Sequence, residues 1–168
     1  MNKMQEIRIE KITLNAGVGE AGDKLEKAAR LLKNITGMEP LRTSSKKRIP
    51  TWGVRPGLGI ACMVTLRGKK AEEVLRQLFE GVDGKLPAKK FDKFGNFSFG
   101  ITEYINIPDV QYDVEIGIIG FNVAVTLERP GFRVKRRRVK NYIGSKHKIK
   151  REDAITFIKS KFGIEVEE

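Results

Sequence analysis

The sequence is poor in the residues that form disulfides and bind metals. Its 168 residues include one cysteine, Cys62, and one histidine, His147. One cysteine cannot form an internal disulfide, and the two residues together are too few for a zinc site of the usual Cys/His kind. We therefore expect no metal and no cofactor, and we expect the protein in the reducing cytoplasm.

Long apolar runs are also lacking. No stretch approaches the roughly 18 to 20 apolar residues that cross a bilayer, and the first six residues, M-N-K-M-Q-E, contain no apolar signal segment. Catalytic groups are sparse, since Ser44 and Ser45 have no histidine near them in sequence. His147 lies in a basic segment, where we expect it to be a phosphate contact or a bystander rather than a catalytic base. We expect neither a membrane protein nor an enzyme.

Positive charge, by contrast, is abundant and concentrated. The net charge is +12, and residues 129–151 hold eleven Lys or Arg and no acid, so the rest of the chain carries only +1. Residues 40–70 are also free of acids and hold eight more cations, without which the remainder carries −7. A slightly acidic domain with two basic segments is typical of a protein that binds a polyanion such as RNA.

Hydrophobic periodicity predicts an α+β fold. Strands are expected at residues 7–14 (with a register slip between Ile9 and Ile12), 60–66, 97–104 and 121–128. Helices are expected from Asp23, with Glu26 as in a capping box, to Gly37; over about 70–80; and over about 152–162, with Ala154, Ile155 and Ile158 buried. This order favours a mostly antiparallel sheet with helices packed on one face. We expect one domain, residues 1–168, with long basic loops at about 43–59 and 129–150.

Residues 17–22, G-V-G-E-A-G, form a G-x-G-x-x-G pattern between a strand and a helix. A nucleotide-binding enzyme of the Rossmann type is one interpretation, with Glu39 near the position of a ribose-binding acid. However, Pro40 and a basic loop follow Glu39, where a second parallel strand would be needed. The other two interpretations are a purely structural tight turn and backbone N–H groups that hold an RNA phosphate.

The two basic segments differ in character. Residues 43–59 read as a long loop with the only tryptophan, Trp52, among cations, which suits stacking on nucleic acid or anchoring of the loop to the domain. Residues 133–140, R-V-K-R-R-R-V-K, lie between a strand and a helix, so we expect ordering on a phosphate backbone rather than a solvated tail. An anionic membrane surface is a weaker alternative, because no broad apolar helix face accompanies the charge.

Four motifs occur in order along the chain: K-I-T-L-N-A-G-V-G-E-A at 11–21, R-T-S-S-K-K-R-I-P-T-W-G-V-R-P-G-L-G-I at 42–60, V-T-L-R-G at 64–68 and F-G-N-F-S-F-G-I at 94–101. Together they resemble the fifth family of universal large-subunit ribosomal proteins, whose members bind 5S rRNA. Residues 129–150 and V-T-L-E-R-P-G at 125–131 resemble the archaeal and eukaryotic branch of that family.

The resemblance implies a structural role in the large ribosomal subunit, attaching 5S rRNA to the central protuberance. It also implies large-subunit rRNA, P-site tRNA and a small-subunit head protein, reached through an intersubunit bridge, as partners. No membrane partner and no homo-oligomer are expected.

Matching positions carry two sets of expected site residues, and charge supplies a third. The 5S rRNA set is Asn15, Gly17, Gly19, Gly22, Thr43, Lys46, Lys47 and Arg48. The tRNA-facing loop is Thr51, Trp52, Val54 and Arg55. The third set rests on charge alone and is assigned to rRNA: Arg133, Lys135, Arg136, Arg137, Arg138 and Lys140.

Overall fold

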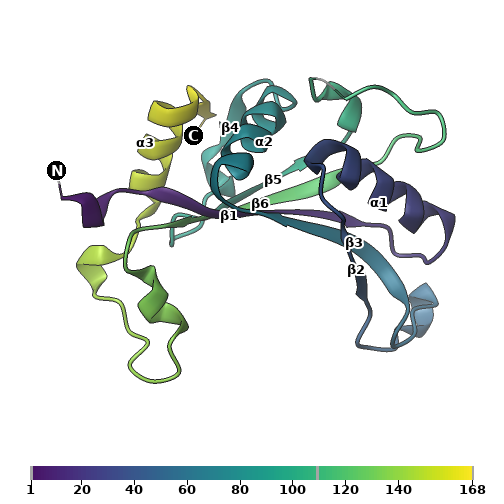
Figure 1. Cartoon of the computed structure of the whole chain (residues 1–168), viewed down its shortest axis with the longest axis horizontal. Helices are drawn as coiled ribbons and strands as arrows, with labels where there is room; N and C mark the ends of the chain where they lie inside the picture. Colours follow the sequence, from purple (N-terminus) through teal and green to yellow (C-terminus); the bar gives the residue numbers. More distant parts are fainter. Residues whose placement is uncertain (1, 109, 168) are drawn as a thin grey trace.

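The computed structural model describes residues 2–108 and 110–167 as an α+β fold, as predicted (Figure 1). Five strands form an antiparallel sheet in the order β2-β3-β1-β6-β5: β1 (Arg8–Gly17), β2 (Leu41–Ser44), β3 (Gly59–Leu66), β5 (Phe97–Ile101) and β6 (Phe121–Glu128). Three α-helices cover one face of it: α1 (Asp23–Thr36), α2 (Gly68–Glu80) and α3 (Arg151–Phe162). The other face carries no α-helix from the described part of the chain (Figure 1).

Shorter elements connect these. A two-stranded parallel ribbon joins β4 (Lys85–Pro87) to β7 (Glu165–Glu167). The 3-10 helices are η1 (Lys3–Gln5), η2 (Pro50–Trp52), η3 (Ala88–Lys90), η4 (Tyr104–Asn106), η5 (Phe132–Arg136) and η6 (Ser145–His147). No helix within the described ranges is both long and apolar enough to cross a membrane.

The central strand β1 contains the predicted register slip. A bulge lies between Ile9 and Lys11 in its pairing with β6. The bulge adds one residue, so Ile9 and Ile12 are both buried although three positions separate them. Leu14 and Ala16 continue the same buried face, and the strand extends to Gly17, beyond the predicted end at residue 14.

Helix packing builds the core on the covered face. The buried residues of α1 recur at helical spacing, from Leu25 to Ile35, and α1 and α2 contact β3 and β1 respectively. Phe121, Val123, Val125 and Leu127 are buried from β6, as predicted. In α3, Ala154 and Ile158 are buried, but Ile155 is only half-buried.

The helix ends confirm one prediction and correct another. Gly37 ends α1 in the left-handed conformation, with φ of 61°. The predicted capping box at Asp23 and Glu26 is wrong, because the N-cap is Gly22, which has no side chain to accept a hydrogen bond. The chain turns from strand to helix at Gly22 with φ of 117°, which favours glycine, so both acids lie inside the first turn.

Three strand predictions differ from the structure. Residues 41–44, which overlap the predicted loop at 43–59, form edge strand β2 on β3. The sequence predicts no strand at residues 85–87, yet they pair with the C-terminal β7. The strand predicted over 97–104 ends at Ile101, and Tyr104 lies in η4. Short edge strands show little alternation, so only the partner strand identifies them.

Candidate nucleic-acid interface

The face of the sheet without α-helices, which we call the open face, is lined by uncharged side chains at its centre. Asn15 on β1 lies beside Met63 on β3 and Asn122 on β6, and the next row contains Thr65, Thr13 and Ala124. Ser98 on β5 extends that row. Hydroxyl and amide groups can donate and accept hydrogen bonds, so this surface can bind a polar ligand without fixing its charge.

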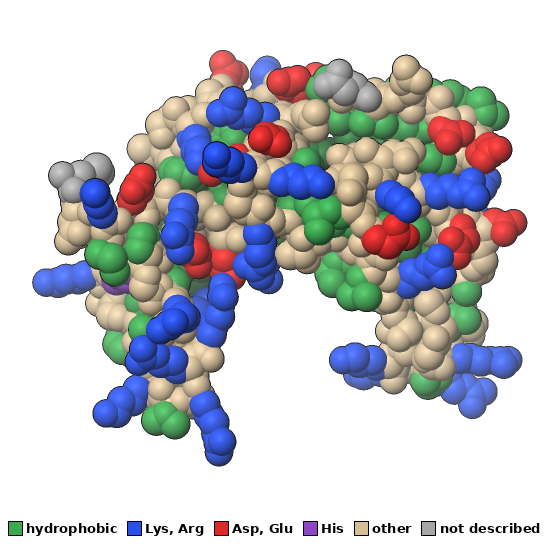
Figure 2. All heavy atoms as spheres, viewed as in Figure 1, with side chains coloured by type: hydrophobic (Ala, Val, Ile, Leu, Met, Phe, Trp, Pro, Cys, Tyr) green, Lys and Arg blue, Asp and Glu red, His purple; other side chains and the backbone are tan. Residues whose placement is uncertain are grey.

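Two basic segments project from opposite ends of the sheet on the side of the open face (Figure 1). The hairpin loop is residues 45–58, between β2 and β3, and the basic insertion is residues 129–150, between β6 and α3. Figure 2 shows Lys and Arg side chains gathered on both projections, with a hollow between them under the sheet. The molecule thus has the form of an arch with a neutral ceiling and two cationic sides.

Backbone hydrogen bonds order the hairpin loop. Ser45 N donates to Leu58 O at 2.8 Å, Gly57 N donates to Ser45 O at 2.9 Å, and an isolated bridge joins Ile49 to Val54. Among the expected residues, Lys46, Lys47, Arg48, Thr51 and Arg55 are exposed. Thr43 on β2 is half-buried, and its hydroxyl donates to Ala61 O at 3.1 Å.

Trp52 and Val54 differ in exposure. The Trp52 side chain is 74% exposed at the end of η2, so it does not anchor the loop to the domain. Val54, placed in the tRNA-facing set by the resemblance, is only 3% exposed. Trp52 is therefore available to a partner, whereas Val54 holds the loop together from inside.

The glycine-rich turn begins as an extension of β1. The N–H groups of Val18 and Gly19 both donate to Ile60 O, at 3.0 and 2.9 Å, so they are already used. Gly19 and Gly22 have φ of 78° and 117°, and a Cβ at either position would meet only open space. The turn thus needs glycine for its conformation, and it leaves space in front of the start of α1.

Topology excludes the Rossmann interpretation of this turn. In the described part of the chain, strand β1 pairs with β3 and β6, and both pairs are antiparallel. The chain after α1 enters β2, the antiparallel edge strand, rather than a parallel neighbour of β1. Glu39, the supposed ribose-binding acid, instead pairs with Lys33 at 2.7 Å. A dinucleotide site requires the parallel βαβ unit, which these strands do not form.

The basic insertion is fixed at its base. Arg129 is largely buried; it donates to Asp153 at 3.1 Å and to the carbonyls of His147 and Lys148. The His147 ring contacts Pro130 O through Nε2 at 2.9 Å and meets the Phe132 ring edge-on. His147 is therefore part of the loop's own packing through these two contacts.

Two carboxylates on the open face hold three arginines. Glu128 pairs with Arg8 at 2.7 Å, and Glu10 pairs with Arg67 at 3.7 Å. Arg136 of the insertion contacts Glu10 and lies 3.9 Å from Glu128. Of the six insertion cations expected to bind rRNA, Arg136 is thus tied to the sheet, while all six side chains are exposed.

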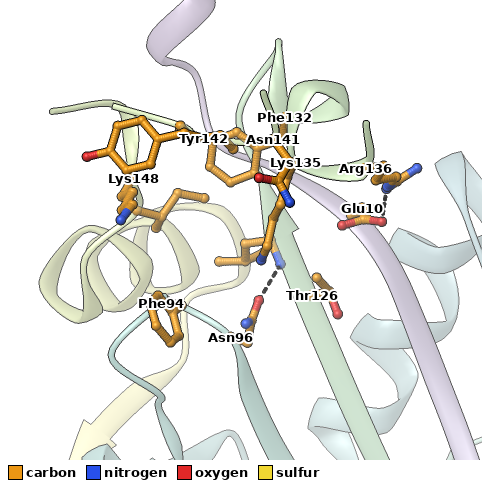
Figure 3. A pocket seen from close by; sticks show the side chains of 13 residues that line it. Glu10, Phe94, Asn96, Thr126, Phe132, Lys135, Arg136, Asn141, Tyr142 and Lys148 are labelled. Atoms are coloured by element: carbon orange, nitrogen blue, oxygen red, sulfur yellow. Dashed lines mark hydrogen bonds and ion pairs between the residues drawn. The ribbon is translucent and has the colours of Figure 1, made fainter. Parts of the chain in front are cut away.

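Sequence reasoning missed a pocket where the insertion meets the open face (Figure 3). Its volume is about 470 Å³, within the range of small-ligand sites. It is lined by residues of β1, β6, the turn before β5 and the insertion, including Phe94, Asn96, Tyr142 and Lys148. The signal in the sequence was one aromatic residue in each of two turn-like segments, Phe94 and Tyr142. Their proximity follows only from the fold.

The remaining reactive groups are possible metal ligands and the thiol of Cys62. Among residues 2–108 and 110–167 no three His, Cys, Asp or Glu side chains cluster as metal ligands. Cys62 is fully buried, and its burial raises the pKa of the thiol, an effect that nearby Arg42 partly opposes.

Two family models match the chain. The model described as "Ribosomal protein L5" matches residues 2–55, and a second model, for the C-terminus of the same ribosomal protein family, matches residues 59–157. Large ribosomal subunit protein uL5 of Nanoarchaeum equitans is 50% identical over 97% of each chain. The uL5 protein of Sulfurisphaera tokodaii is 48% identical over 100% of this chain and 96% of its own. That of Methanococcus vannielii is 49% identical over 97% and 92%.

Proposed function

This chain belongs to the ribosomal protein L5 family, and from that membership we propose that it binds 5S rRNA and helps attach it to the central protuberance. The family makes it an RNA-binding protein of the large subunit of the cytoplasmic ribosome, and not an enzyme. We propose that residues 1–168 act as one domain, whose hairpin loop and basic insertion both contact RNA.

The arch is the observation that carries this proposal. A neutral polar ceiling between two cationic sides complements a rod of negative charge, because Lys and Arg can reach phosphates on both flanks. Asn15, Asn122 and Thr13 on the ceiling can hydrogen-bond ribose hydroxyls and groove edges, which is how proteins recognise RNA helices. Shape and position, rather than base sequence, would then supply most of the specificity.

The 5S rRNA contacts are proposed for the β1–β2–β3 end of the arch. Asn15, Thr43 and the cations Lys46, Lys47 and Arg48 share this end with the turn containing Gly17, Gly19 and Gly22. Since Val18 and Gly19 donate to Ile60 O, a phosphate here would be held by N–H groups at the start of α1 rather than by the whole turn.

The tip of the hairpin loop is proposed to face P-site tRNA. Thr51, Trp52 and Arg55 present exposed side chains there, and an indole beside a guanidinium suits contact with a nucleic acid. Val54 contributes by supporting the loop. A bridge to a protein of the small-subunit head completes the proposal and rests on the family resemblance alone.

The basic insertion is proposed to bind large-subunit rRNA. Arg133, Lys135, Arg137, Arg138 and Lys140 are exposed and can neutralise phosphates, while Arg136 orients the segment through Glu10. Its lack of acids favours a phosphate backbone over a mixed-charge protein surface.

A charge-neutralising variant tests the 5S rRNA assignment. Lys46→Gln, Lys47→Gln and Arg48→Gln combined should weaken 5S rRNA binding and lower the slope of log affinity against log salt by about two to three. The matched control replaces three exposed cations of the helix layer, Lys69, Arg76 and Lys159, by Gln. Equal weakening by both triples would contradict a 5S rRNA site on the arch.

A further inference from the structure

We propose that the pocket between the basic insertion and the open face receives an unpaired nucleobase of ribosomal RNA. This inference rests on the proposed rRNA binding and deepens it, because it assigns a site for a base where charge alone predicts only phosphate contacts. Figure 3 shows Tyr142, Lys148 and Phe94 on one side of the hollow, and Arg136 with Glu10 on the opposite side.

The aromatic side chains at this pocket are unusually exposed. Phe94 is 60% exposed and Tyr142 is 72% exposed, although both line the same cavity. Large apolar side chains left in solvent at a concave site indicate a binding surface. An aromatic ring offers a flat face on which any base can stack, and such stacking is how proteins hold unpaired bases of RNA.

The turn that carries Phe94 is held firmly. Gly95 N donates to Asp92 O at 3.0 Å, and Asp92 N donates to Asn96 O at 2.7 Å. A Cβ on Gly95 would lie 2.5 Å from Cγ2 of Ile149, so the turn packs directly against the end of the insertion. Phe94 is thus exposed on a fixed turn, which lowers the entropy cost of stacking a base on it.

Asn96 supplies a polar group of known orientation. Its Oδ1 accepts a hydrogen bond from Leu127 N at 3.3 Å, which extends the β5–β6 ladder by one step (Figure 3). Because Oδ1 is the acceptor in this bond, the amide NH₂ remains the donor for a ligand. A nucleobase carries carbonyl oxygens and ring nitrogens along its edge, and these accept such a donor.

Cations surround the pocket and define the class of its ligand. The Lys148 ammonium lies over one face of the Tyr142 ring, 5.4 Å from its centroid, so a base would stack on the opposite face. Lys135 and Arg136 line the same hollow. Aromatic faces next to cations match a nucleotide, whose base stacks while its phosphate pairs with Lys or Arg. An aromatic side chain of a protein would bring no anionic group to Lys135 and Lys148.

Affinity for a single-stranded RNA decamer of mixed sequence tests the pocket. Phe94→Ala combined with Tyr142→Ala should weaken binding about fivefold to a hundredfold, which corresponds to the loss of stacking of one base. The matched control is Tyr112→Ala, because Tyr112 is also exposed, at 53%, and lies outside the pocket. Unchanged affinity of the double variant would overturn the inference.

Two further readouts separate this inference from the proposed function. Binding of the double variant to 5S rRNA tests the arch independently: retained 5S rRNA binding with lost decamer binding supports the pocket. A photoreactive phenylalanine analogue in place of Tyr142, in assembled large subunits, should crosslink to an unpaired rRNA nucleotide. A crosslink to a ribosomal protein instead would overturn the nucleobase assignment and leave the 5S rRNA proposal intact.

Discussion

The guanidinium of Arg136 contacts the carboxylate of Glu10, which lies 126 positions earlier in the chain, on β1. This ion pair joins the middle of the basic insertion to the open face of the sheet. The Glu10 side chain is only 16% exposed, so the pair is partly shielded from solvent. A segment that charge alone would leave solvated is thereby given a fixed direction, and under the proposed rRNA binding this would preorganise its other cations.

Replacing Glu10 tests this preorganisation. Glu10→Gln removes the charge and preserves the shape, so it should lower the free energy of unfolding by about 1 kcal/mol or less. Amide hydrogen exchange in residues 132–136 should become faster, because η5 loses its link to β1. The control is Glu103→Gln, at an exposed acid that forms none of the ion pairs found in the described residues. Unchanged exchange in η5 would show that the pair does not order the insertion.

Gly95 tests the contact between the turn before β5 and the insertion. Gly95→Ala places a methyl group 2.5 Å from Ile149 and forces a non-glycine residue to φ of 78°. Strain of both kinds should destabilise the fold by about 1 to 3 kcal/mol in urea unfolding. Gly144→Ala, in the same insertion but at φ of −55° and with no neighbouring atom within 4 Å, should change the stability by less than about 0.5 kcal/mol. Equal effects would contradict close packing at Gly95.

The hairpin loop should divide into supporting and contacting residues. Trp52→Ala and Arg55→Ala should leave the unfolding free energy within about 0.5 kcal/mol, since both side chains are exposed. Each should weaken tRNA binding to the P site of reconstituted ribosomes and spare affinity for 5S rRNA. Val54→Ala should instead cost about 1 to 2 kcal/mol of stability, because the removed methyl groups are buried. Parallel loss of tRNA and 5S rRNA binding would refute the division.

Cys62 provides a pH-dependent report on the core. Burial raises the pKa of its thiol above the ordinary value of 9.0, so the folded state keeps the proton longer than the unfolded state does. The resulting stabilisation is present below pH 9 and is lost as the pH rises through the folded pKa. Wild type should therefore lose stability more steeply above pH 9 than Cys62→Ala does. An aromatic disulfide reagent at pH 8 should react slowly with native protein and rapidly in urea.

Much of the fold could be predicted because its signals are local. The alternation at residues 121–128 and the spacing of Leu25, Ala28 and Leu32 identify β6 and α1 without reference to any partner. Strands β2, β4 and β7 could not be identified, since three or four residues at an edge take their conformation from the strand they pair with. The capping-box prediction was wrong because the N-cap is Gly22, whose backbone φ of 117° favours glycine, and glycine has no side chain to accept the capping hydrogen bond.

The candidate site, like the fold, has features that the sequence predicts and features that only the structure shows. Charge runs and the exposed Trp52 are visible in the sequence, because cations and a lone aromatic residue in a loop carry their chemistry locally. The pairing of Arg136 with Glu10 and the convergence of Phe94 with Tyr142 depend on contacts between distant segments. Sequence periodicity contains no information on such contacts. The arch likewise depends on the fold, because it exists only where both basic segments project on the same side of the sheet.

The most direct test of the central claim is binding to 5S rRNA over a salt series, with an unrelated structured RNA as control. A protein that neutralises about six to ten phosphates should lose on the order of a thousandfold or more in affinity between about 50 and 200 mM salt. Recognition by the arch predicts that 5S rRNA stays clearly preferred as the salt concentration rises. If both RNAs bind alike and weaken together, the protein binds by charge alone, and the proposed 5S rRNA function is contradicted.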